Sequence, residues 1–137
     1  LYDLGLGPAL GWLGEETQKK YGLAVTCSLD GMDGPVPQAL GILLFQSVRE
    51  LLFNTVKHAG ASRAWIDLYR EGEDIMVRVR DNGKGFDPDR QKVRSDEKGG
   101  FGLFSIGERL ISQGGYMDVQ SAPGQGSTFT LVCPLEG

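Results

Sequence analysis

The chain has few cysteines, a single histidine and no long apolar run among its 137 residues. Cys27 and Cys133 lie far apart, each in an apolar, strand-like stretch, so we expect two reduced thiols in the core rather than a disulfide framework. No apolar run approaches the roughly 20 residues that a membrane span needs. A signal-like segment is also missing. These absences predict a cytoplasmic domain that makes no direct membrane contact.

Positive charge is not concentrated in any part of the sequence. Lys and Arg number 14 against 18 Asp and Glu, for a net charge of −4, and the basic residues are scattered. This pattern argues against a nucleic-acid-binding surface, so any polyanion that the chain binds should be small. The length fits one domain with its own core, and no linker divides it, which predicts a single domain over residues 1–137. Because residue 1 is Leu rather than Met, we expect the domain to be part of a longer protein.

Residue periodicity and turn residues predict an α+β fold. The expected helices cover residues 3–21, 37–57 and 103–113, and Gly22 and Gly60 provide stop signals. The expected strands cover residues 24–28, 63–69, 75–80, 116–121 and 128–132. Hairpins connect the last four strands in pairs, so the sheet should be mostly antiparallel, with the three helices on one face. A ligand cleft is expected between a helix and the glycine-rich, charged loop that begins at residue 82.

The long central helix carries a polar stripe. At about 100° per residue, Glu50, Asn54 and Lys57 share one side of it. The carboxylate and the amide oxygen are hard ligands of the kind that Mg²⁺ accepts, and the ammonium one turn further on is placed for phosphate. A solvated helix face is the alternative, and it is the better interpretation of this helix taken alone.

The first glycine segment, DNGKGFD, occupies residues 81–87. The Asp81 carboxylate can accept a hydrogen bond from the exocyclic amine of adenine, which guanine does not offer at that position. Gly83 and Gly85 permit positive φ and a close approach of backbone to a flat base. A plain Asn-Gly turn is the alternative. A calcium loop is excluded, because the two glycines stand where oxygen ligands are needed.

Two further glycine segments follow. In the second, Gly99, Gly100 and Gly102 lead directly into a helix, whose free N–H groups suit phosphate; a flexible loop before an ordinary helix is the alternative. In the third, PGQGSTF, Thr128 begins a strand and could steady Asp81 through a water, although a simple strand threonine is equally compatible. The chain contains no Walker A motif and no G-x-G-x-x-G, which excludes the two commonest nucleotide-binding folds.

Four segments in this order resemble a known family. RELLFNTVKHAGAS, DNGKGFD, GGFGLFSIGERL and GQGSTF are similar to the N, G1, G2 and final threonine-bearing boxes of the catalytic domain of sensor histidine kinases, which has the Bergerat ATPase fold. The opening LYDLGLGPALGWLGEE is similar to the nitrate-sensor and degradation-sensor class of these kinases. The resemblance covers nearly the whole chain. It implies a two-layer α/β sandwich with a mostly antiparallel five-stranded sheet.

The resemblance also implies roles for individual residues. Asn54 and Glu50 would be Mg²⁺ ligands, and Glu50 and Lys57 would be catalytic, although the role of Glu50 as a base stays open. The nucleotide contacts would come from both helices and from all the glycine segments, namely Asn54, Lys57, His58, Asp81, Gly83, Gly85, Phe86, Gly100, Phe101, Gly102, Leu103 and Thr128. His58 is the only histidine, and it shares its helix with the expected metal ligand, so we do not expect it to be the phosphoacceptor.

The implied activity is that of an ATP-dependent protein histidine kinase. The γ-phosphoryl group of MgATP would pass to a histidine on a separate dimerisation domain, which precedes the N-terminal helical segment 1–22, and then to an aspartate of a response regulator. The isolated domain is expected to be a monomer and its parent a homodimer, anchored in a membrane or not. Another ATPase of the superfamily, an anti-sigma-type serine kinase and a degenerate protein-binding module are the alternatives.

Overall fold

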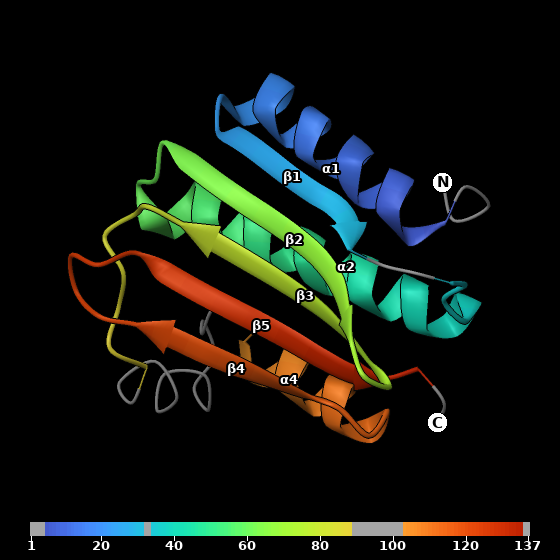
Figure 1. The fold of residues 1–137 in the computed structure, drawn as a ribbon. Coiled ribbons are helices and arrows are strands. Elements are labelled where there is room, and N and C mark those ends of the chain that lie inside the picture. The colour runs from blue at the N-terminus through green and yellow to red at the C-terminus, as the bar shows by residue number, and fades with distance from the viewer. Residues whose placement is uncertain (1–4, 32–33, 89–102, 136–137) are drawn as a thin grey trace.

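The computed structural model describes residues 5–31, 34–88 and 103–135. Within these ranges the helices are α1 (Leu6–Tyr21), α2 (Gln38–Asn54) and α4 (Leu103–Ser112), and α2 continues into a π-helical turn, η2 (Thr55–Ala59). The strands are β1 (Ala24–Gly31), β2 (Arg63–Glu71), β3 (Asp74–Asp81), β4 (Tyr116–Ser121) and β5 (Ser127–Pro134). The helices cover one face of a single sheet (Figure 1). The predicted α+β class and two-layer arrangement are confirmed.

The five strands are ordered β1-β2-β3-β5-β4. Strand β1 runs parallel to β2, and the three remaining pairs are antiparallel. The parallel pair arises because the chain crosses over through α2 between β1 and β2, and parallel strands need such a connection. The prediction of a mostly antiparallel sheet is therefore correct, and the first strand is its exception.

Strand alternation separates a buried face of the sheet from an open one. Val77, Val79 and Phe129 are buried under the helices, whereas Arg78 and Arg80 between them point the other way. Their guanidinium groups stack on aromatic rings of β2, Arg78 at 5.6 Å from the centroid of Tyr69 and Arg80 at 5.2 Å from that of Trp65. Cation–aromatic contacts of this kind stabilise side chains on the open face.

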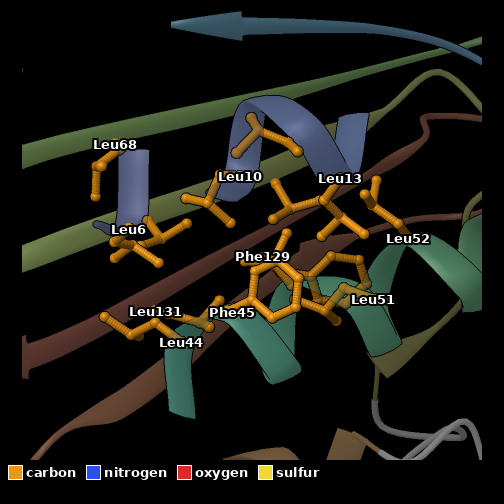
Figure 2. Packing of buried hydrophobic residues seen from close by; sticks show 14 of the residues in the cluster. Leu6, Leu10, Leu13, Leu44, Phe45, Leu51, Leu52, Leu68, Phe129 and Leu131 are labelled. Carbon is orange, nitrogen blue, oxygen red and sulfur yellow. The ribbon is translucent and has the colours of Figure 1, made fainter. Parts of the chain in front are cut away.

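The core lies between α2 and the sheet. Leu44, Val48 and Leu51 are completely buried on one side of α2, and each such side chain contributes roughly 1.5–3 kcal/mol relative to exposure. Leucines of α1 close the upper edge of this cluster (Figure 2). The helix Gln38–Ala59 contains an 18-residue window with a mean hydropathy of 1.2, enough by length and composition alone to span a membrane. Its packing against the sheet is that of a core helix.

Element ends follow the glycine signals. Gly22 and Gly60 adopt left-handed φ values of 75° and 61° directly after α1 and η2, as expected for helix C-caps. Pro37 is the N-cap of α2 rather than its first helical residue, one position from the prediction.

Both cysteines are free, with Cys133 fully buried and Cys27 half-buried under α1. Burial raises the pKa of the Cys133 thiol to about 11, so this thiol is unreactive at neutral pH.

Candidate functional site

A cavity of about 240 Å³ opens between the C-terminal end of the α2–η2 helix and the segment that follows β3. Its walls come from four stretches of the chain that are far apart in the sequence. The lining residues are Leu51, Asn54, Thr55, His58, Ala59, Asp81, Lys84, Gly85, Phe86, Leu103, Ser127 and Phe129. The cleft predicted between a helix and the glycine-rich loop lies at this position.

Asp81 is placed in the cavity by strand alternation. It is the last residue of β3 and continues the inward series of Val77 and Val79, so its carboxylate lies on the helix-covered face. Its neighbours across the sheet are Ala64 of β2 and Ser127 of β5. With 8% of its surface exposed, Asp81 is a buried acid at the deep end of the cavity.

The electrostatics of Asp81 combine two opposing effects. Burial raises the pKa of its carboxyl above the ordinary value, because desolvation disfavours the charged form. Hydrogen bonds from the N–H of Gly83, 2.9 Å from Oδ1, and from the side chain of Thr55 act in the opposite direction. The carbonyl of Leu51, 3.0 Å from the Thr55 hydroxyl, competes with Asp81 for the single hydroxyl proton. The result is a fixed, partly satisfied acceptor aimed into a small cavity.

Glycines in the loop after β3 allow the backbone to approach its neighbours closely. Gly85 has φ +67°, and a Cβ there would collide with the carbonyl oxygens of Ala122 and Gly126. At Gly83 a Cβ would lie 2.5 Å from the carbonyl oxygen of Ala59. Both positions therefore require glycine for the wall of the cavity to close.

An aromatic pair and a serine network hold the opposite wall. The rings of Phe86 and Phe129 are stacked, with centroids 6.1 Å apart and an interplanar angle of 22°. The Phe86 N–H donates to Ser121 Oγ at 2.9 Å, and this hydroxyl lies 2.8 Å from Ser127 Oγ. The loop after β3 is thus tied to the β4–β5 hairpin, which gives the cavity an apolar wall suited to a flat ring.

The polar stripe of the central helix is only partly brought to the cavity. Asn54 lines it, and so does His58. Lys57 is exposed and does not line it; its ammonium lies 5.1 Å from the centroid of the Phe53 ring. The lining residues of this helix are spaced i, i+3, i+4, i+7 and i+8 from Leu51, which is one face of an ordinary helix, and Lys57 lies outside that face. His58, four residues after Asn54, therefore takes the place in the cavity wall that was expected of Lys57.

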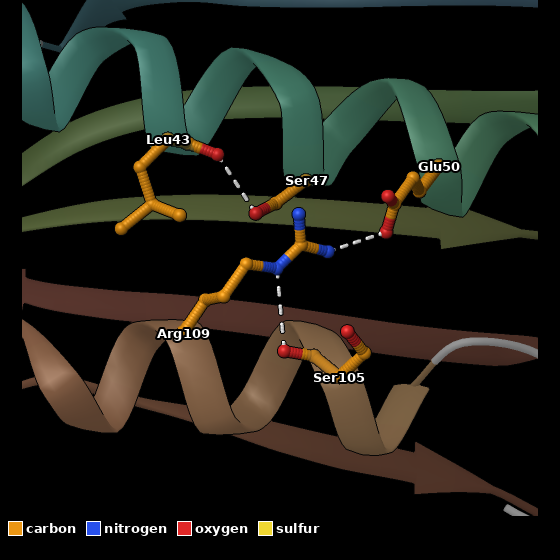
Figure 3. A network of polar contacts seen from close by, with 5 residues as sticks. All are labelled: Leu43, Ser47, Glu50, Ser105 and Arg109. Atoms are coloured by element: carbon orange, nitrogen blue, oxygen red, sulfur yellow. Dashed lines mark hydrogen bonds and ion pairs between the residues drawn. The ribbon is translucent and has the colours of Figure 1, made fainter.

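Glu50 does not line the cavity either. Its carboxylate oxygen accepts a hydrogen bond from Arg109 of α4, with Oε2 and Nη2 2.7 Å apart (Figure 3). The guanidinium also donates from Nε to the carbonyl of Ser105, at 3.3 Å. The ion pair joins α2 to α4 across 59 positions of sequence. The sequence interpretation assigned no role to Arg109.

Thr128 lies away from the cavity, on the open face of the sheet. It pairs with Arg80 and lines a groove there together with Thr130. Its neighbour Ser127 pairs with Asp81 and lines the cavity. The hydroxyl expected near Asp81 is therefore that of Ser127. The sequence did contain a signal for this, because Ser127 alternates with the apolar residues Phe129 and Leu131 and so lies on the same face of the strand.

The second glycine segment falls mostly outside the described residues. Gly100, Phe101 and Gly102 belong to it, whereas Leu103 is described, buried at the start of α4 and part of the cavity wall. Sequence reasoning also missed Thr55 and Lys84. Lys84 could have been found, since it is the cation between the two glycines of DNGKGFD.

The lining residues fit an adenine nucleotide with Mg²⁺. The buried Asp81 carboxylate supplies an acceptor for a base amine, and the stacked phenylalanines supply an apolar wall. The Asn54 side chain offers an amide oxygen, a hard ligand. The described residues contain no group of three or more His, Cys, Asp or Glu that could hold a metal ion by themselves. This donor set suits Mg²⁺, which in proteins is usually bound by one or two side chains together with substrate phosphates.

Comparisons with known proteins agree with this geometry. Residues 40–137 match the family described as histidine kinase-, DNA gyrase B-, and HSP90-like ATPase. The signal transduction histidine-protein kinase/phosphatase DegS of Brevibacillus brevis is 33% identical over 135 residues, which is 98% of this chain and 34% of that protein. The sensor protein VraS of Staphylococcus aureus (strain COL) is 28% identical over 98% of this chain and 37% of its own length. The chain thus spans about a third of these relatives.

Solved structures show the same fold. The blue-light activated histidine kinase of Erythrobacter litoralis EL346 superposes with a TM-score of 0.71 over 95% of this chain and 42% of that protein, at 23% sequence identity. Its histidine kinase domain, solved separately, gives the same score over 61% of that shorter chain.

Proposed function

Because the chain belongs to the histidine kinase-, DNA gyrase B-, and HSP90-like ATPase family, we propose that it is the ATP-binding catalytic domain of a sensor histidine kinase. The observation that carries the proposal is the buried Asp81 carboxylate at the deep end of a cavity under α2. The Gly83 N–H and the Thr55 side chain satisfy this acid in part, and an adenine amine would supply a further donor. Residues 1–137 would form this one domain, with α1 following the dimerisation domain of the parent protein.

Recognition of the base would rest on Asp81 and its supports. The Gly83 N–H donates to Oδ1 and fixes the carboxylate, whose remaining acceptor capacity would serve the exocyclic amine of adenine. Guanine presents a carbonyl oxygen at that position, and two acceptors facing each other in a buried site are unfavourable. Phe86 would lie against the ring. We therefore expect selection of ATP over GTP.

Binding of the phosphates would use the helix side of the cavity. Asn54 would ligate Mg²⁺, which when bound neutralises charge on the phosphates during phosphoryl transfer. His58 lines the same wall; its partial burial, together with the charges of Lys57 and Lys84, lowers the pKa of its imidazole below the ordinary value. Gly100 and Gly102 would add backbone N–H donors, and Lys57 would reach the phosphates from the rim.

The phosphoryl acceptor would be a histidine outside this chain. His58 is the only histidine here, and it lies on the cavity wall with Asn54, where it would contact the nucleotide rather than accept from it. Glu50 would act on the incoming histidine only after rearrangement of its ion pair with Arg109. The onward partner would be an aspartate of a response regulator, in the cytoplasm.

Calorimetric titration of the purified chain with ATP, with and without Mg²⁺, tests the nucleotide site. We expect micromolar Mg²⁺-dependent binding of ATP and no binding of GTP. The kinase assignment is tested by adding radiolabelled ATP to the chain together with the dimerisation segment of its parent. Label should appear on that segment, with the acid lability and alkali stability of phosphohistidine.

Each outcome bears on a different part of the proposal. Absence of binding at millimolar ATP would contradict the nucleotide site itself. ATP binding with phosphate released to water and no labelled segment would favour an ATPase. Acid-stable label on a separate protein would favour a serine kinase.

A further inference from the structure

The mouth of the cavity carries a positive charge that the sequence interpretation did not use. Among the described lining residues, Lys84 is the one side chain that is always cationic at neutral pH, and Asp81 is the one acid. Lys84 is exposed, whereas Asp81 is buried at the deep end. The cavity is therefore polarised, with its negative end inside and its positive end at the solvent.

The backbone of Lys84 is fixed against the helix that carries Asn54. Its N–H donates to the carbonyl of Ala59 at 2.8 Å, at the end of η2. Its own carbonyl accepts from the N–H of Gly124 in the β4–β5 turn. The flanking glycines, Gly83 and Gly85, cannot carry a side chain without a collision. Lys84 is thus held between two elements of the cavity wall, and only its flexible stem is free to move.

The charge of Lys84 acts on the helix side of the cavity. Lys84 lines the cavity together with His58 and Ala59 of η2, and its charge contributes, after burial and the charge of Lys57, to the lowered pKa of the His58 imidazole. Among the described residues Lys84 forms no ion pair. A cation that lines a cavity without a carboxylate partner is available to a ligand anion.

The orientation of a bound nucleotide follows from this polarity. The base, uncharged and flat, would enter toward Asp81, and the phosphates would stay at the mouth, because burial of their charge is costly. We propose that Lys84 is a specificity-determining residue that binds the polyphosphate of ATP and, unlike Lys57, does so from within the cavity lining. This inference rests on the proposed function and assigns one more contact to it.

A ligand series separates a phosphate contact from a base contact. The affinities of the intact chain and of Lys84→Met for Mg·ATP, ADP and adenosine are measured by calorimetry or by displacement of a fluorescent nucleotide. The variant should bind ATP about 3- to 10-fold more weakly at low salt. Adenosine should bind within about twofold of the wild type, since it has no phosphate. The loss for ATP should shrink in about 0.5 M NaCl, where screening is strong.

Two further variants control for charge and shape. Lys19→Met removes an exposed lysine on α1 that does not line the cavity, and it should leave every affinity unchanged. Lys84→Arg keeps the charge and should retain ATP affinity. Since Lys84 is exposed, the variants should fold, which far-UV circular dichroism checks.

The inference is overturned if Lys84→Met weakens adenosine as much as ATP, or changes neither. Equal losses for Lys84→Met and Lys19→Met would also overturn it, because the effect would then come from net charge. If the wild-type chain itself binds no ATP, the proposed function is refuted, and this result is distinguished from a failure of the Lys84 inference because it does not involve the variants.

Discussion

Substitution of Asp81 by Asn changes one charge at the deep end of the cavity and keeps the size of the side chain. Asp81 Oδ1 accepts the N–H of Gly83 at 2.9 Å, so the amide oxygen of Asn must take this place. The amide nitrogen then replaces the second carboxylate oxygen. An adenine amine would meet a donor where it needs an acceptor. Loss of one hydrogen bond to a charged group corresponds to about 1.5–3 kcal/mol, so ATP affinity should fall about 10- to 100-fold.

The same substitution should stabilise the fold. Burial holds the folded-state pKa of Asp81 above its unfolded value. Stability from this group is therefore present below the unfolded pKa of about 3.9 and is lost as pH rises through the folded pKa. Asn does not titrate and avoids that loss. At pH 7 the free energy of unfolding of the Asp81→Asn variant should exceed that of the wild type by on the order of 1 kcal/mol.

Urea unfolding at pH 4 and pH 7, together with calorimetry, tests both parts. The stability gain should be larger at pH 7 than at pH 4, and the preference for ATP over GTP should narrow, because the new amide can donate to the guanine carbonyl. Asp118→Asn, an exposed position on β4, is the matched control. ATP affinity within threefold of the wild type would refute the role of Asp81, and lower stability at pH 7 would refute the desolvation argument.

Other changes test the rest of the site. Asn54→Ala should abolish the Mg²⁺ dependence of ATP binding, whereas Lys57→Ala should weaken ATP less than Asn54→Ala or the loss of Asp81; calorimetry with and without Mg²⁺ ranks the variants. Gly85→Ala forces a side chain into a positive-φ position against two carbonyls and should cost about 3 kcal/mol in urea unfolding; wild-type stability would contradict the described loop. Glu50→Gln breaks the exposed pair with Arg109 and should cost less than about 1 kcal/mol, so a large loss of phosphotransfer at unchanged ATP affinity would assign Glu50 to the chemical step.

Much of the fold was readable from local patterns. The hairpins at 63–81 and 116–134 follow from alternating residues around short turns, and the helix ends follow from Gly22 and Gly60. The family was readable from four motifs in order, and the family match confirms it. These features depend on neighbours in the chain, which is why periodicity and turn residues are enough to predict them.

The residues that line the cavity were harder to predict from the sequence. Helical periodicity placed Glu50, Asn54 and Lys57 on one stripe, but the neighbouring face of the helix, which carries Asn54 and His58, is the one that lines the cavity. Which face of a helix lines a cavity depends on how the helix packs, and the spacing of one polar stripe does not specify it. Thr128 was expected near Asp81, but along β5 the residues that alternate onto the helix-covered face are Ser127 and Phe129, and Thr128 lies on the other face.

The chain sequence alone determines the two-layer α+β class, the order of its elements and the loop in which only glycine fits. Tertiary packing decides which polar groups meet. Glu50 and Arg109 are 59 positions apart, and Lys84 reaches the helix side of the cavity because its N–H bonds to Ala59. Such contacts depend on the distance between elements after they pack, whereas local sequence specifies only the direction in which each side chain leaves its own backbone.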